Sequence, residues 1–410
     1  MEIVVVGAGV VGLSCAFSLA GDGHALMVLD RDPPGDKASF GNAGGIGVTE
    51  LVPASGPGVI WQIPGWLIDP LGPLALRLLH APYMLPWLCR FLRAGRPDRV
   101  APIAAQLAAL NARVYDDLVP LLRAVGLEGA LQRCGALTVY ETEQGFARDA
   151  AAWALRRAHG IACEAMDGDA ARAMEPALGP RVVRGVFTPD WAQLADPKAL
   201  VDRLRAHLAG RGVRIVQGDA AAIEPGARPA IRLRDGGRQA ADAVVVAAGA
   251  WSARLARTLG DRALLESERG YNFTVPNPGI SLGREVIFAE RQFVASPLAP
   301  GLRIGGAAEF AGLEAPANYA RAKALVTLAH RYLPGLDSSV GTSWMGQRPT
   351  TPDSLPVIGR SPRAGGVFYA FGHGHLGLTQ SATTGRLIAD LVGGRSPPIA
   401  IAGLGIERFG

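Results

Sequence analysis

The 410-residue chain is 49% hydrophobic and 19% charged, an ordinary composition for a globular protein large enough to bury two or three domains' worth of core. Its net charge of +5 comes from dispersed arginines and not from a basic stripe interleaved with aromatic residues, which argues against nucleic-acid binding. The four cysteines are scattered without metal-binding spacing, so neither a disulfide framework nor a metal site is predicted, and a reducing, cytoplasmic compartment fits best.

The chain opens with a β-α-β unit. Ile3–Val6 is a β-branched run, a glycine turn and a helix-period segment follow it, and Ala25–Leu29 is a second apolar run. Glu2 stands where a signal peptide would carry positive charge, and glycines interrupt the apolar stretch. The N-terminus is therefore expected to fold into the domain and not to act as a signal peptide.

The turn of this unit carries a GxGxxG motif, which consists of Gly7, Ala8, Gly9, Val10, Val11 and Gly12. The first glycine permits the tight turn, the second leaves room for a pyrophosphate, and the third lets the helix pack on the strand. Asp30 ends the second strand, where a carboxylate can bind ribose hydroxyls and would repel a 2′-phosphate. The motif predicts FAD or NAD, while glycines that serve only a tight turn remain the alternative.

A segment of different composition follows at Val59–Leu92. It is rich in Trp, Leu and Pro and contains Trp61, Trp66 and Trp87. The segment is either a helical part of a substrate domain or a surface that binds peripherally to the cytoplasmic face of a membrane. No run of 18 or more apolar residues occurs, so no membrane-spanning helix is expected.

Later segments extend the parallel sheet and add a second one. A helix over Leu200–Leu208, strands over Val213–Val216 and Ala243–Val246, and a last helix after Gly377 complete the first sheet. Short runs separated by Gly and Pro predict a mainly antiparallel second sheet. These runs are Val182–Phe187, Tyr271–Val275, Glu285–Phe288, Gln292–Ala295 and Leu302–Ile304.

Four stretches together resemble the D-amino acid oxidase and dehydrogenase family of flavoproteins, most closely its bacterial D-amino acid dehydrogenase branch. They are the fingerprint through Asp30-Arg31, Ser39-Phe40-Gly41-Asn42-Ala43-Gly44, Ala247–Ser252, and Trp344–Gly377. The likeness covers the whole chain and is only weakly specific for a substrate. It implies an α/β fold in which a Rossmann-type FAD-binding domain (1–52, 196–262 and 338–410) is interleaved with an α+β substrate-binding domain on a mainly antiparallel sheet (53–195 and 263–337).

The resemblance implies noncovalent FAD, because the position at which some relatives tether their flavin through a cysteine is Gly346 here. Taken without the resemblance, Ser39–Asn42 could be a plain surface turn. The turn before the last helix can aim backbone N–H groups at the flavin pyrimidine. Beyond the fingerprint and Asp30, the implied cofactor contacts are Arg31, Ser39, Asn42, Ala43, Gly44, Ala220, Ala248, Gly249, Trp251, Gly346, Gly372, Gly374, His375, Leu376, Gly377 and Thr379.

Three residues are candidates for roles towards the substrate. Arg348 matches the family's carboxylate-binding arginine, and a solvated surface arginine is its alternative. Tyr271, expected to start a strand near the flavin, either binds the substrate carboxylate or amine or packs beneath the ring. His373 is the candidate for proton transfer, and the segment Arg303–Gly312 is expected to shape the pocket without doing chemistry.

The implied reaction is hydride transfer from the Cα of a D-amino acid to flavin N5, which gives an imino acid and then a keto acid. D-Proline or a D-hydroxyproline would give a cyclic imine. Electrons would pass to a quinone or other acceptor, or to oxygen. The alternatives are oxidation of glycine, sarcosine or another secondary amine on the same fold, and a non-catalytic dinucleotide-binding subunit.

Overall fold

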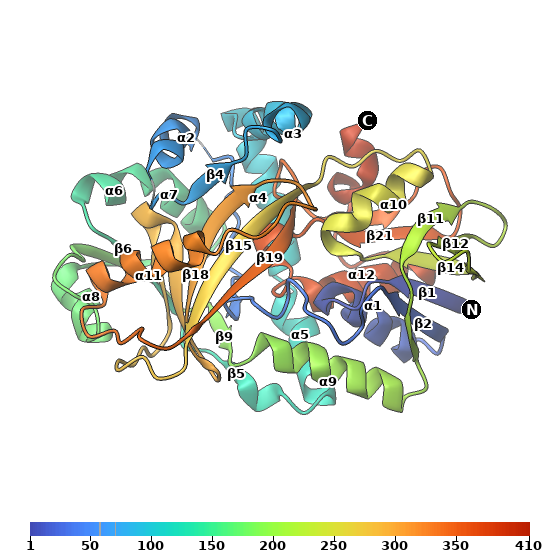
Figure 1. Ribbon diagram of the computed structural model, residues 1–410, viewed down its shortest axis with the longest axis horizontal. Coiled ribbons are helices and arrows are strands. Elements are labelled where there is room, and N and C mark those ends of the chain that lie inside the picture. Colours follow the sequence, from blue (N-terminus) through green and yellow to red (C-terminus); the bar gives the residue numbers. More distant parts are fainter. Residues whose placement is uncertain (57–58, 70) are drawn as a thin grey trace.

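A computed structural model describes residues 1–56, 59–69 and 71–410 of the chain; Pro57, Gly58 and Pro70, which belong to the predicted substrate-binding segment, lie outside the described residues. Two large sheets organise the molecule. A six-stranded sheet lies on the right of Figure 1, where the N-terminus is found, and a nine-stranded sheet lies on the left.

The six-stranded sheet has the order β10-β2-β1-β14-β21-β20, and its strands are parallel except for β20, which is antiparallel to β21. This confirms the parallel sheet and its β-α-β opening. Its strands are β1 (Glu2–Val6), β2 (Ala25–Asp30), β10 (Arg214–Gln217), β14 (Ala243–Val246), β20 (Val357–Arg360) and β21 (Val367–Phe371).

Successive side chains of β1 point to opposite faces of this sheet, and each face is covered. Ile3 and Val5 face a core that includes helices, while Val4 and Val6 face a small antiparallel sheet and one helix. The helices of the first face are α1 (Val10–Gly21), α4 (Pro97–Asn111), α5 (Val114–Ala124), α9 (Pro197–Gly210) and α12 (Ser381–Val392). The second face is covered by β11 (Ala220–Glu224), β12 (Ala230–Leu233), β13 (Arg238–Ala240) and α10 (Ser252–Thr258).

The nine-stranded sheet has the order β19-β15-β18-β17-β16-β6-β8-β7, with β4 paired to β18. Its pairs are antiparallel except β16 with β6 and β18 with β4, as the sequence predicts for the second sheet. Its strands are β4 (Leu74–Leu76), β6 (Ala136–Tyr140), β7 (Glu164–Asp167), β8 (Arg184–Thr188), β15 (Glu266–Val275), β16 (Glu285–Phe288), β17 (Phe293–Leu298), β18 (Gly301–Phe310) and β19 (Thr342–Thr350).

Two features of this sheet differ from expectation. Tyr271 lies in the middle of β15 and does not start it, because the polar residues from Glu266 onward already pair with β19. Strand β19 belongs to the nine-stranded sheet although its residues fall in the segment 338–410 assigned to the FAD-binding domain. The exact domain boundaries stay a prediction.

The remaining elements flank the nine-stranded sheet or link it to the first one. Helices α2, α6 and α7 lie at one edge of the view, and α11 packs on β15 and β18 (Figure 1). Their bounds are α2 (Val59–Ile68), α3 (Ala81–Ala94), α6 (Glu143–Arg148), α7 (Ala150–Ala158), α8 (Gly168–Met174) and α11 (Ala320–Tyr332), and a third small sheet is formed by β3 (Gly45–Ile46), β5 (Leu131–Gln132) and β9 (Ala192–Leu194).

Candidate active site

A cavity of about 1990 Å³ lies between the carboxyl ends of the parallel strands and the β15, β18 and β19 part of the nine-stranded sheet. Sites for small molecules commonly have volumes of roughly 300–1,000 Å³, so this cavity has room for a dinucleotide and a further small ligand. The predicted site residues that line it are Gly7, Gly9, Val10, Val11, Asp30, Arg31, Ser39, Asn42, Ala43, Ala220, Ala248, Gly249, Trp251, Tyr271, Gly346, Arg348, His373, Gly374, His375, Leu376, Gly377 and Thr379.

Four predicted cofactor residues, Ala8, Gly12, Gly44 and Gly372, lie behind the cavity wall. A Cβ atom on Gly12 would be 2.0 Å from the carbonyl oxygen of Gly7, so this glycine lets helix α1 pack on the turn. Gly44 and Gly372 have φ values of +83° and +82°, which favour glycine. The structure therefore gives these residues a role in shaping the backbone around the cavity.

The glycine turn leaves the N-terminus of α1 open towards the cavity. Gly7 has a φ of +116°, and a Cβ there would lie 2.3 Å from the carbonyl oxygen of Ala247. A Cβ on Gly9 would meet only the Ser39 hydroxyl, 3.7 Å away. The first turn of α1 carries no acidic residue, so its N–H groups and positive dipole end remain suited to a phosphate.

Asp30 is held at the edge of this turn. Its Oδ2 accepts a hydrogen bond of 2.7 Å from the amide of Ala8, and its Oδ1 lies 3.2 Å from Nζ of Lys37. Beside it the Arg31 guanidinium stacks on the Trp251 ring, with 3.8 Å between Cζ and the ring centroid. Asp30 thus lines the cavity in a fixed orientation, where a ribose would reach its free lone pairs.

The loop 39–44 is docked from the opposite sheet. Nη1 of the buried Arg303 on β18 donates to the carbonyl oxygens of Asn42 (2.6 Å) and Phe40 (3.2 Å). Asn272 on β15 donates to the carbonyl of Gly41 at 2.9 Å. Burial lowers the pKa of Arg303, which is consistent with a guanidinium removed from water. The loop is therefore a fixed part of the cavity wall.

Open space beside several glycines tests whether the cavity fits FAD. A Cβ on Gly249 would have no heavy atom within 4 Å, and one on Gly374 or Gly377 would have its nearest neighbour at 3.8 or 3.6 Å. Gly9 and these three glycines all line the cavity and leave room at their positions for the close approach that a planar ring system and a pyrophosphate need. The residues present fit the cofactor.

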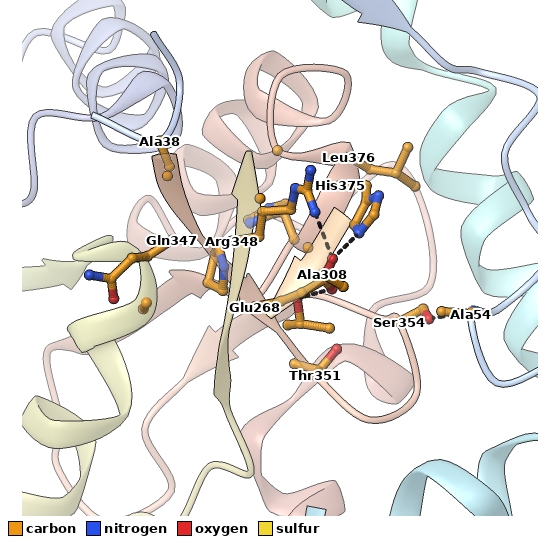
Figure 2. Close-up of a pocket in the computed structure, with 18 of the residues that line it drawn as sticks. Ala38, Ala54, Glu268, Ala308, Gln347, Arg348, Thr351, Ser354, His375 and Leu376 are labelled. Carbon is orange, nitrogen blue, oxygen red and sulfur yellow. Dashed lines mark hydrogen bonds and ion pairs between the residues drawn. The ribbon is translucent and has the colours of Figure 1, made fainter. Parts of the chain in front are cut away.

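At the far end of the cavity, Arg348 on β19 points towards Glu268 on β15, and His375 points to the same carboxylate (Figure 2). Nη1 of Arg348 donates to Glu268 Oε1 at 2.7 Å and to the Ala307 carbonyl at 3.1 Å. Nε2 of His375 lies 2.8 Å from Glu268 Oε1, and the Thr350 hydroxyl donates to Oε2 at 3.0 Å. Every carboxylate oxygen of Glu268 is thus engaged.

Glu268 is charged despite its burial. Burial on its own would raise the pKa of this carboxyl, but the charges and hydrogen bonds of His375 and Arg348 outweigh it and hold the pKa well below the usual range. The sequence did not point to this residue as a functional one, although a charged side chain within a strand of mostly buried residues was a usable signal.

The other two substrate candidates are engaged with protein groups. The Tyr271 hydroxyl donates to Glu309 and accepts from the amide of Asn318 at 3.0 Å, and burial followed by the Glu309 bond raises its pKa to about 12. The His373 ring is buried, lies 2.9 Å from the Thr384 hydroxyl, and has a pKa lowered to about 3 by burial. His373 is therefore neutral near pH 7.

Glu285 on β16 is a further carboxyl of the cavity wall that the sequence did not single out. Its side chain is buried, and its Oε2 has no hydrogen-bond partner among the described residues. Burial raises its pKa to about 8. Trp87 of the tryptophan-rich segment is also buried, and its Nε1 donates to the Thr350 carbonyl at 3.0 Å, so it is not part of an exposed surface.

Comparisons with known proteins agree with the cavity's chemistry. A family model described as FAD dependent oxidoreductase matches residues 2–391. The D-amino-acid oxidase of Bradyrhizobium diazoefficiens is 35% identical over 420 residues, which cover 100% of this chain and 99% of the relative. The D-amino acid dehydrogenase of Rhizobium johnstonii is 33% identical and is matched over 100% of both chains.

Solved structures show the same fold. The glycine oxidase of Geobacillus kaustophilus superposes with a TM-score of 0.73 at 23% identity, covering 98% of this chain and 97% of the other. The L-proline dehydrogenase of P. horikoshii has a TM-score of 0.75 at 16% identity, covering 100% and 97%. With a family model that spans most of its length and a dinucleotide cavity that fits the cofactor, the chain belongs to the FAD-dependent oxidoreductases and is an enzyme that uses FAD.

Proposed function

We propose that the enzyme oxidises a D-amino acid to its imino acid, with noncovalently bound FAD as the oxidant and Arg348 as the group that binds the substrate carboxylate. The names of the full-length relatives support the substrate class. The observation that carries the proposal is the position of the Arg348 guanidinium on the wall of the cavity that the cofactor residues also line.

Arg348 keeps part of its hydrogen-bonding capacity free. Both protons of Nη1 are used by Glu268 and Ala307, but Nη2 has only a 3.5 Å contact with the Gly306 carbonyl. Nε has no hydrogen-bond partner among the residues that the structure describes. Two adjacent donors are thus available to the two oxygens of a carboxylate, the geometry that guanidinium supplies best.

Bound FAD would supply the oxidising power for removal of a hydride from the substrate Cα. The substrate amine also loses a proton, and water converts the imino acid to a 2-oxo acid and ammonia. Tyr271 and His373 are not assigned a proton-transfer step, since the hydroxyl is bonded to Glu309 and the imidazole is buried and neutral. The zwitterionic substrate therefore gives its ammonium proton to water.

Replacement of Arg348 tests the carboxylate site. Arg348→Ala should retain flavin but lose roughly ten- to a hundredfold in kcat/KM, since a charge-assisted hydrogen bond is worth about 1.5–3 kcal/mol. Arg348→Lys keeps the charge without the two-pronged geometry and should recover only part of the loss. Benzoate should perturb the flavin absorbance of the parent and lose this effect in both variants; equal perturbation in parent and Arg348→Ala would place the carboxylate elsewhere.

The same cavity chemistry would admit glycine, sarcosine or D-proline, so a substrate panel must include them. A cyclic secondary amine such as D-proline would give a cyclic imine. Preference for D-amino acids with longer side chains over glycine and sarcosine supports the proposal, and the reverse order would favour the secondary-amine alternative.

We further propose that electrons leave to a quinone at a membrane surface. Most exposed large apolar side chains of the described residues lie between Ile60 and Leu92, including Trp61 (85% exposed) and Leu79 (92%). Residues 59–94 contain three arginines and a single acid, Asp69. Arg77 pairs with Glu309 at 3.3 Å, so Arg90 and Arg93 carry the remaining positive charge of an apolar surface that suits an anionic lipid interface. No helix of the described residues has both the length and the apolar character to cross a bilayer.

Vesicle sedimentation tests this surface. The parent should co-sediment with phosphatidylglycerol-containing vesicles and much less with pure phosphatidylcholine, and Trp61→Ser with Leu79→Ser should lower the bound fraction at least fivefold. Val340→Ser, which removes an exposed apolar side chain elsewhere (71% exposed), is the control and should bind as the parent does. A parent that binds neither vesicle would end the membrane proposal.

A further inference from the structure

We propose that Glu268 is an internal counter-anion of the substrate site, which makes the cavity select net-neutral amino acids over simple anionic carboxylates, including the 2-oxo acid product. The inference rests on the proposed function, because it takes Arg348 as the group that binds the carboxylate. It assigns Glu268 a positioning and selectivity role, without contact with the reacting atoms.

The pairing is built into the sheet. Glu268 on β15 and Arg348 on β19 are direct cross-strand partners in the antiparallel register. Side chains at such positions leave the sheet on the same face with Cβ atoms about 4.5–5.5 Å apart. Gly270 makes room for the guanidinium, since a Cβ there would lie 2.3 Å from Cζ and Nη2 of Arg348. The ion pair is therefore fixed before any ligand binds.

The contacts of Glu268 leave the ligand-binding edge of Arg348 open. Oε1 engages Nη1 at 2.7 Å, while Nε and the second proton of Nη2 remain available. Thr350 and His375 bind the same carboxylate and keep it from rotating away. The Glu268 side chain is 8% exposed, so solvent screens its charge little. A carboxylate on the open edge thus meets an arginine that is already paired with a buried carboxylate.

The charge balance matters because the reaction changes the charge of the ligand. An amino acid, oxidised FAD and water give a 2-oxo acid, ammonium and reduced FAD. The amino acid is a zwitterion of net charge zero, whereas the 2-oxo acid carries −1. A partly buried arginine without this partner would hold the anionic product more strongly than the substrate. Glu268 removes this advantage, because its charge repels the carboxylate of either ligand but attracts the ammonium group that only the amino acid carries.

Ligand binding to the flavin-loaded enzyme tests the role of Glu268. Dissociation constants of benzoate and of pyruvate are measured from the flavin absorbance change in the parent and in Glu268→Gln. Since a like charge within ~4–6 Å commonly shifts an ionic equilibrium by about one pK unit, Glu268→Gln should bind both anions roughly tenfold more tightly. The ratio of pyruvate inhibition constant to amino-acid KM should fall by a similar factor. A variant whose site is damaged would bind both anions more weakly than the parent does. Tighter binding would therefore show that loss of the Glu268 charge, and not damage to the site, causes the change.

Glu266→Gln is the matched control, because Glu266 lies two residues away on the same strand and pairs with His80 at 2.9 Å instead of Arg348. Its benzoate affinity should equal that of the parent. Equal or weaker anion binding by Glu268→Gln would overturn the inference.

If Glu268→Gln does not retain flavin, the same benzoate titration is made with Glu268→Asp, because the shorter side chain holds its carboxylate farther from Nη1 of Arg348. Two- to threefold tighter benzoate binding supports the inference, and unchanged or weaker binding overturns it. Benzoate that perturbs neither the parent nor any variant would instead contradict the carboxylate site of the proposed function.

Discussion

Gly9 is the position at which we expect an added side chain to block cofactor binding. Gly9→Val would place branched carbons where only the Ser39 hydroxyl now lies nearby, in the space that fits the pyrophosphate. The variant should fold but lose the yellow colour, measured as the ratio of absorbance at the flavin band to that of the protein. Gly21→Val, at a position with no heavy atom within 4 Å of the added Cβ, is the control. Full flavin content in Gly9→Val would refute the assignment of the turn.

The raised pKa of Glu285 predicts that the free energy of unfolding depends on pH. Its pKa is raised by burial to about 8, whereas it is near the ordinary glutamate value in the unfolded chain. Between these values the folded protein keeps a proton that the unfolded chain has released, so the free energy of unfolding falls as pH rises. The effect approaches about 1.4 kcal/mol per pH unit for a single group.

Glu285→Gln removes this titration while keeping the shape of the side chain. Its stability relative to the parent should therefore increase from pH 5 to pH 8, measured as the difference in Tm of the flavin-loaded proteins. A difference that does not change with pH would show that Glu285 is ionised in the folded protein.

At the scale of elements, the loop 39–44 depends on a strand distant in sequence. Arg303→Met should keep the fold of both sheets but release the loop carbonyls of Phe40 and Asn42 from their charged donor. Since hydrogen bonds to charged groups are worth about 1.5–3 kcal/mol, flavin affinity should fall at least tenfold. Equilibrium dialysis of the flavin measures the loss, with the exposed Arg238→Met as the control. Unchanged affinity would mean that the loop holds its conformation alone.

The elements differ in how readily the sequence predicts them. Ala243–Val246 and Glu285–Phe288 are strands with the predicted bounds, because apolar or alternating runs bounded by turn residues mark them. Strand β19 was missed, since Gly346 and Pro349 interrupt a segment of mixed polarity. Its pairing with β15 compensates for poor local propensity, and such long-range pairing leaves no local signal.

At the scale of the whole molecule, residues from Gly7 to Thr379 converge on one cavity. The glycine turn could be predicted because its chemistry is local to a β-α-β unit. The pairing of Glu268 with Arg348 could not, because only the register of two strands brings residues 80 positions apart together. The hydrogen bonds of the Tyr271 hydroxyl could not be predicted either, because its partners Glu309 and Asn318 lie far from it in the sequence.

Both large sheets contribute to the wall of this cavity, so we expect the cofactor and the substrate to share one site. Strand β15 contributes Asn272 to the flavin loop and Glu268 to the carboxylate region within five residues. A shift of this strand would therefore disturb both regions together. The central expectation for the whole molecule is that a D-amino acid reduces the bound flavin.

Anaerobic titration of the flavin-loaded enzyme with D- and L-amino acids tests that claim most directly. The account predicts that at least one D-amino acid bleaches the flavin band completely, that its L-enantiomer does not, and that a quinone analogue then restores the colour. Restoration by air alone at the same rate would identify oxygen as an equally good acceptor. A flavin that stays oxidised with every D-amino acid, while glycine, sarcosine or L-amino acids bleach it, would contradict the account.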